Sequence, residues 1–131
     1  MMKTIVRSVL ISAFAMVAAP AYAVEAWQAF SCELADEKTE ADVIAAAQKW
    51  LKAARTMKGG EEMQVSIHFP VAAASGGSDF KMILKAPSFK AWGTFWDGYK
   101  GSPAHKVDEE TDEITECPSA RLFEGVVIKV E

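Results

Sequence analysis

One aromatic stretch decides the fold of this chain: Pro87-Ser88-Phe89-Lys90-Ala91-Trp92-Gly93-Thr94-Phe95-Trp96-Asp97-Gly98-Tyr99. On a helical wheel its five aromatic side chains fall within an arc of roughly 120°, whereas Lys90 and Asp97 fall outside it. Ser88 is a typical N-cap residue, so we predict a helix over residues 88–99. Its wide aromatic face needs a flat apolar partner.

The segments around this helix have the patterns of strands and of one more helix. In residues 62–72, apolar side chains alternate with Gln64, Ser66 and His68, which is typical of a strand with one buried face. Pro70 favours an edge position for this strand, because proline cannot donate a hydrogen bond to a neighbour. The predicted strands cover residues 25–34, 62–72, 79–85 and 121–130. The other helix runs from its N-cap Thr39 to about Met57 or Lys58, and residues 104–118 form an acidic loop with at most a short helical turn.

The resulting order is strand, helix, strand, strand, helix, strand. This order predicts the α+β class and a ferredoxin-like βαββαβ fold. The four-stranded antiparallel sheet then has the strand order 4-1-3-2 and carries both helices on one face. In that order the second strand is an edge, in agreement with Pro70, and the last strand lies beside the first. No linker divides residues 24–131, which we expect to form a single domain.

Cys32 and Cys117 are the two cysteines of the chain. The predicted topology brings them together, because Cys32 lies near the end of the first strand and Cys117 lies just before the last. In an oxidising compartment such a pair is most simply a disulfide; free thiols or a metal site are the alternatives. The sequence has neither a CxxC spacing nor a histidine close to the cysteines, so it does not favour a zinc site. A disulfide would close a loop of about 85 residues, which stabilises a fold by about 4 to 5 kcal/mol.

Residues 1–23 have the pattern of a bacterial signal peptide. Lys3 and Arg7 precede an apolar run, and Ala21-Tyr22-Ala23 is a typical cleavage signal, so we expect cleavage after Ala23. The alternative, an uncleaved anchor helix, requires a longer apolar run. We therefore expect a periplasmic or secreted protein with no membrane contact after cleavage. Loss of the two cations Lys3 and Arg7 changes the net charge from −4 to −6, which disfavours nucleic acid as a partner.

The element order resembles the dimeric α+β barrel superfamily of small ferredoxin-like proteins. The resemblance covers the chain after the signal peptide and rests on the strand Met63 to Val71, its hairpin and the helix Ser88 to Tyr99. Proteins of that superfamily pair the open faces of two sheets, so the resemblance implies a homodimer through the open sheet face. Its members include cofactor-free monooxygenases, haem enzymes and proteins without known activity, and a shared fold does not choose among them.

The candidate ligand-binding residues lie on the sheet face that the helices leave open. Gln64, Ser66 and His68 point to this face if the apolar residues between them face the helices, and Trp27 joins them if the register of the first strand allows it. An imidazole beside an amide, a hydroxyl and an indole can bind a small polar-aromatic ligand or transfer a proton. In an enzyme His68 would be the acid or base; otherwise it is a half-exposed strand residue or part of a subunit contact.

Other chemistry-bearing patterns are weaker. His105, near Asp108 and Glu109, could hold a metal ion or lie in a solvated loop, and residues 108–116 lack the pattern of a calcium loop. The aromatic face of helix 88–99 could line a ligand pocket or form core. The sequence contains no nucleophile elbow, phosphate loop or haem attachment motif, so we expect neither a metal nor a cofactor.

These observations favour an exported, non-catalytic domain that binds a small molecule or a partner protein. The alternative is a cofactor-light monooxygenase-like or haem-related enzyme that uses the open sheet face around His68. A structural envelope protein is the third hypothesis. The three differ at one point: an enzyme needs a cavity that contains His68, a binding module needs a cavity alone, and a structural protein has its open face filled by side chains.

Overall fold

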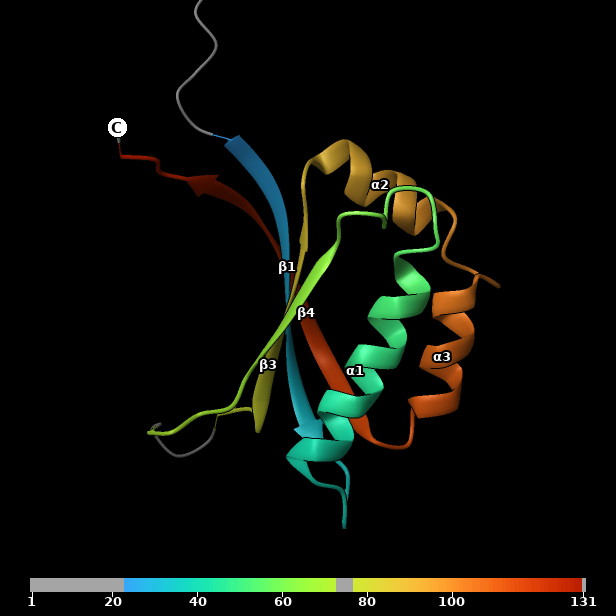
Figure 1. Ribbon diagram of the computed structural model, residues 1–131. Coiled ribbons are helices and arrows are strands. Elements are labelled where there is room, and N and C mark those ends of the chain that lie inside the picture. Colours follow the sequence, from blue (N-terminus) through green and yellow to red (C-terminus); the bar gives the residue numbers. More distant parts are fainter. Residues whose placement is uncertain (1–22, 73–76, 131) are drawn as a thin grey trace, which may run out of the picture.

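The computed structural model describes residues 23–72 and 77–130. The predicted signal peptide before Ala23 and the first half of the predicted turn at residues 75–78 lie outside these ranges. Figure 1 shows a layer of strands and a layer of helices. The elements are β1 (Ala23–Leu34), α1 (Glu40–Ala54), β2 (Gln64–His68), β3 (Phe80–Ala86), α2 (Phe89–Asp97), α3 (Pro103–Thr111) and β4 (Thr115–Val127).

The strands form one antiparallel sheet with the order β2-β3-β1-β4. This is the predicted order read from the opposite edge, so the predicted sheet is confirmed. The helices lie on the same side of the sheet, and no described element covers its other face (Figure 1). β2 is an edge strand, as Pro70 indicated, although the strand ends at His68, before the proline.

A third helix, α3, occupies the acidic region for which the sequence suggested a loop. Ser102 is its N-cap, and the Ser102 hydroxyl accepts a hydrogen bond from the backbone N–H of His105 at 3.1 Å. Pro103 takes the first helical position, where a missing N–H does no harm because that group has no partner inside a helix. The prediction of a loop is wrong because, after the aromatic helix has ended at its C-cap Gly98, Ser102-Pro103 begins a new helix.

The end of α1 also differs from the prediction. The helix ends at Ala54 rather than near Met57, because the chain tightens into a short-range bond from the N–H of Met57 to the carbonyl of Ala54 (3.0 Å). Gly59 follows with a positive φ of 87°, and a Cβ atom on it would lie 2.5 Å from the carbonyl oxygen of Ala91. Glycine therefore allows this connection to pack directly against α2.

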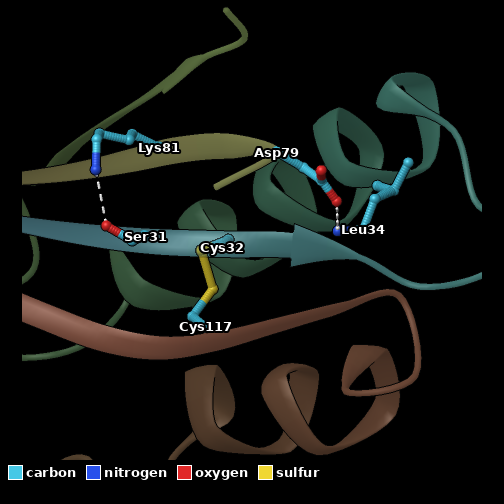
Figure 2. Close-up of a disulfide and its surroundings, with 6 residues drawn as sticks. All are labelled: Ser31, Cys32, Leu34, Asp79, Lys81 and Cys117. Carbon is cyan, nitrogen blue, oxygen red and sulfur yellow. Dashed lines mark hydrogen bonds between the residues drawn. A yellow bond between two sulfur atoms is a disulfide. The ribbon is translucent and has the colours of Figure 1, made fainter. Parts of the chain in front are cut away.

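The disulfide joins the two longest strands. Cys32 of β1 and Cys117 of β4 are bonded, as predicted (Figure 2). β4 begins at Thr115, earlier than predicted, so Cys117 lies within the strand rather than before it. The register shifts here by a β-bulge, in which Cys117 and Pro118 together oppose Cys32. Pro118 has no N–H to donate, and an edge strand beside a bulge is where a strand tolerates proline.

The core lies between the sheet and the helices. Phe95 of α2 is fully buried and packs edge-on against Trp50 of α1, with ring centroids 5.7 Å apart. The rest of the predicted aromatic face is not all core: Phe89 is 41% exposed, and Trp96 and Tyr99 are only partly buried. Part of this face is therefore free to line a cavity.

The oxidised cysteine pair is compatible with folding in an oxidising compartment, such as the periplasm or the extracellular space. Within the described ranges, no helix is both long enough and apolar enough to cross a membrane. The predicted cleavage site, after Ala23, falls at the start of β1.

Candidate functional site

The open face of the sheet carries the residues predicted to bind a ligand. The register places side chains from the four strands opposite one another in rows across this face. In the order β2, β3, β1, β4, the rows are Gln64, Lys85, Trp27 and Phe123; Ser66, Ile83, Ala29 and Arg121; and His68, Lys81, Ser31 and Ser119. Trp27 thus shares the face with Gln64, Ser66 and His68, but β3 separates its strand from theirs.

The structure does not bring the four predicted residues into one cluster. The hydroxyl of Ser66 lies 2.9 Å from Nε2 of His68 on β2. Trp27 instead contacts β3, where Nζ of Lys85 lies 3.9 Å from the centre of the indole ring in a cation–π contact. Nearby, Lys81 donates to the hydroxyl of Ser31 at 2.8 Å, as Figure 2 shows.

Trp27 is also held against the backbone of β4. A Cβ atom on Gly125 would lie 2.3 Å from Nε1 of Trp27, so only glycine permits this close approach. Nε1 donates a hydrogen bond to the carboxylate of Glu25 at 2.7 Å. The polar atom of Trp27 is therefore already satisfied within the protein.

Two adjoining cavities lie on the other side of the sheet, among the helices. We call them the acidic cavity, of about 310 Å³, and the aromatic cavity, of about 260 Å³; both are partly open to solvent. Trp50, Met82, Asp108 and Cys117 line both, so the two are compartments of one site. Small-molecule sites have volumes from about 300 Å³ upward. Together the cavities are large enough for a small ligand.

Two helices supply the polar and small residues of the acidic cavity. Ala46 and Trp50 are four residues apart on α1 and so lie on one face of that helix. Asp108 and Asp112 have the same spacing at the end of α3. The helices are held together by an ion pair between Lys49 of α1 and Glu110 of α3.

The aromatic cavity contains a chain of hydrogen bonds. Nε1 of Trp50 donates to the hydroxyl of Tyr99 at 3.3 Å, and this hydroxyl donates to the Asp108 carboxylate at 2.9 Å. Burial raises the pKa of Tyr99 to about 12, and the negative charge of Asp108 contributes to the rise. Tyr99 is therefore neutral at physiological pH, and its proton points toward Asp108.

Trp96 carries a polar atom without a partner. Trp96 lines the aromatic cavity, but its Nε1 is buried and, within the described part of the chain, has no hydrogen-bond acceptor. A buried, unpaired donor costs about 1 to 3 kcal/mol.

His105 helps to begin α3 rather than to form a metal site. Its Nδ1 accepts a hydrogen bond from the backbone N–H of Gly101 at 3.1 Å, and its ring packs on Tyr99 with centroids 5.4 Å apart. Nε2 lies 3.9 Å from the Glu109 carboxylate. Among residues 23–72 and 77–130, no cluster of three or more histidine, cysteine or acidic side chains is close enough to hold a metal ion.

The sequence carried one signal of these cavities, the wide aromatic face of helix 88–99, for which a ligand pocket was an alternative to core. Trp96 and Tyr99 come from that face. Asp108 was predicted only as part of an acidic loop, either beside His105 in a possible metal site or solvated. Because α3 was not expected, the sequence could not place Asp108 beside Tyr99.

Comparison with known proteins shows similarity of fold alone. No protein-family model matches the chain, and no curated protein matches it in sequence. A dimeric ferredoxin-like protein of unknown function from Thermobifida fusca is 10% identical, with a TM-score of 0.50 over 80% of this chain and 92% of its own. Hydroxynitrile lyase from Passiflora edulis is 9% identical, with a TM-score of 0.52 over 86% and 99%. A dimeric ferredoxin-like protein from Bacteroides fragilis is 8% identical, with a TM-score of 0.41 over 81% and 96%.

The chain therefore has the ferredoxin-like fold, as the order of its predicted elements indicated. The resemblance to dimeric ferredoxin-like proteins is confirmed at the level of topology. At these identities a shared fold says nothing about which chemistry the cavities perform.

Proposed function

We propose that this protein is a non-catalytic binding domain that holds a small molecule in the aromatic and acidic cavities. The observation that carries the proposal is the pair of adjoining cavities, whose walls combine aromatic rings with the carboxylate of Asp108. Ligand sites combine apolar and aromatic walls with a few fixed polar groups. Trp50, Met82 and Tyr99 supply such walls, and Asp108 supplies a fixed acceptor.

The raised pKa and the hydrogen bonds of Tyr99 favour a binding role over a catalytic one. A general acid or base works best when its pKa lies near the working pH. The pKa of Tyr99 is raised to about 12 by burial, and its hydroxyl is engaged by Trp50 and Asp108. These bonds hold the cavity in one shape, which lowers the entropic cost of binding.

The proposal includes a homodimer through the open sheet face. The similar protein from Thermobifida fusca is dimeric. The middle of the open face is apolar, with Ala29 and Ile83 flanked by Trp27 and Phe123. An apolar centre with a polar rim is typical of protein interfaces. Gln64, Ser66 and His68 would then lie near the edge of the contact between the two sheets.

The charges on the open face also suit a second copy of the same chain. The register places three cations and three carboxylates on this face. They are Lys81, Lys85 and Arg121, and Glu25, Glu33 and Glu116. Because the charges balance, two copies can meet without net repulsion.

The proposal also includes export of the protein to the periplasm or the extracellular space. The signal-like pattern of residues 1–23 supports it, and so does the disulfide, since disulfides persist mainly in oxidising compartments.

The experiment that tests the binding proposal compares two alanines on α1. Ala46 lines the acidic cavity, whereas its neighbour Ala45 is exposed. Binding of tyrosol, a small neutral phenol, is measured by isothermal titration calorimetry to wild type, Ala46→Leu and Ala45→Leu. We expect saturable binding to wild type and Ala45→Leu, and a loss of about tenfold or more in Ala46→Leu, because the larger side chain fills the cavity. Equal binding to both variants would contradict the proposal, and so would a wild type that binds none of tyrosol, its amine analogue tyramine and its acid analogue phloretic acid.

A further inference from the structure

The charges around the cavities restrict the chemical class of the ligand. We propose that it is a small organic cation, a protonated amine. This inference rests on the proposed function, because it assumes that the cavities hold a ligand.

The first observation is the sign of the charge in the cavity walls. Three carboxylates line the acidic cavity, those of Asp108, Glu109 and Asp112. Among the described residues that line either cavity, none is a lysine, arginine or histidine. An anionic ligand would meet repulsion here, whereas a cation would be attracted.

The second observation is that two of these carboxylates lack an ion-pair partner. The ion pairs found for the acidic region in the described part of the chain use Glu109, Glu110 and Glu113, and none uses Asp108 or Asp112. Asp108 accepts one hydrogen bond, from the neutral hydroxyl of Tyr99. Its charge therefore remains available to a ligand.

The third observation is the position of these acids at the end of α3. The C-terminal end of a helix carries a partial negative charge, which favours cations there and disfavours acids. Asp108 and Glu109 lie in the last turn of α3, Asp112 is its C-cap, and the last turn contains no basic residue. A bound cation would relieve an unfavourable arrangement that the fold by itself leaves in place.

The aromatic walls suit the same charge. Trp50, Trp96 and Tyr99 line the aromatic cavity together with Asp108, and the rings of Trp96 and Tyr99 lie 4.6 Å apart. Ammonium groups bind to the faces of such rings, and tryptophan is the best of them. A cage of aromatic rings with one carboxylate is thus complementary to an amine.

The test uses three probes that share a phenol ring and differ in the charge of the side chain. They are tyramine, a cation; tyrosol, a neutral alcohol; and phloretic acid, an anion. Isothermal titration calorimetry at neutral pH is used for each. We expect tyramine to bind about tenfold more tightly than tyrosol, and phloretic acid to bind more weakly than both. Added salt should weaken tyramine binding and leave tyrosol binding unchanged.

A matched pair of variants locates the effect. Asp108→Asn keeps an oxygen that can accept the Tyr99 hydrogen bond but removes the charge, so the preference for tyramine over tyrosol should disappear. Glu113→Gln removes a charge that lies outside both cavities and pairs with Lys38, so the preference should remain.

The outcomes separate this inference from the proposed function. If tyrosol binds as tightly as tyramine, or if Asp108→Asn retains the preference for tyramine, the cavities bind ligands but the inference that the ligand is a cation is wrong. If tyrosol, tyramine and phloretic acid all fail to bind, both the inference and the proposed function are wrong.

Discussion

Tyr99 connects the three helices around the cavities. It follows α2, accepts a hydrogen bond from Trp50 of α1 and donates one to Asp108 of α3. A phenol hydroxyl can do both at once, which phenylalanine cannot. The shape of the cavities therefore depends on a single oxygen atom.

The pKa of Tyr99 gives a prediction about alkaline pH. In the folded protein burial raises this pKa to about 12, from an ordinary value of 10.0. The unfolded chain thus loses the proton first as the pH rises. The contribution of Tyr99 to the free energy of unfolding is complete below about pH 10 and is lost as the pH rises toward 12. Tyr99→Phe lacks this titration, so the stability difference between wild type and variant should shrink over that range.

Two measurements check this prediction. Urea unfolding of wild type and Tyr99→Phe, at neutral pH and at alkaline pH, gives the stability difference; near neutrality we expect the variant to be less stable by about 1 kcal/mol, because it lacks the two hydrogen bonds. The absorbance of tyrosinate gives the pKa directly. In a chain that carries Tyr22→Phe, Tyr99 is the only tyrosine. A transition close to 10 would contradict the raised pKa.

At the scale of elements, the sequence predicted the strands and two of the helices because their patterns are local. Thr39 and Ser88 are N-caps, as expected, and α1 begins with a complete capping box. α3 was missed because its stripe of apolar residues is short: only Ala104 and Val107 are buried. A nine-residue acidic helix is stabilised by its neighbours more than by its own pattern.

The disulfide gives a prediction for β1 and β4. Its cysteines are 85 residues apart, so Cys32→Ala/Cys117→Ala should lower the free energy of unfolding by about 4 to 5 kcal/mol, chiefly because the unfolded chain is no longer closed into a loop. Urea unfolding measures this loss. Reduction of the wild-type disulfide provides the control and should cause a loss of similar size.

The wild-type protein, expressed with residues 1–23, tests the proposed export. Protein recovered from the periplasm of a bacterial host should begin at Val24 and have a mass lower by two hydrogens than after reduction. An unprocessed N-terminus or free thiols in that fraction would contradict export or the disulfide.

At the scale of the whole molecule, topology was predictable and the cavities were not. The order of the strands follows from the sequence of elements, and Pro70 together with the two cysteines agrees with it. The cavities depend on how far α1 and α3 stand apart and on which side chains fill the gap. Trp96 illustrates the difficulty, because a helical wheel shows it on the core face but cannot show that its Nε1 lacks a partner.

The proposed dimer gives a prediction at this scale. Ala29 lies in the middle of the open face, on β1, and Ala45 is exposed on α1. Light scattering should give twice the mass of one chain for wild type and for Ala45→Glu. Ala29→Glu should give the mass of a single chain, because two carboxylates would be buried close together. Circular dichroism shows whether each variant is folded.

A wild-type protein that is a monomer at micromolar concentration would contradict the dimer. A folded Ala29→Glu variant that remains a dimer would show that the dimer contact does not lie on the open face. The exposed edge of β4 would be the next surface to examine.

The pairing of β1 with β4 has a consequence for biosynthesis. The last strand, β4, pairs only with the first described strand, β1, with Ala23 opposite Val127 and Leu34 opposite Thr115. A ribosome must therefore finish nearly the whole chain before this half of the sheet can form, and such non-local pairing makes folding slow. An exported chain with this order would reach a secretion channel while still unfolded, the state in which it can be threaded. Its cysteines would meet only beyond the membrane, where oxidation can lock the completed sheet.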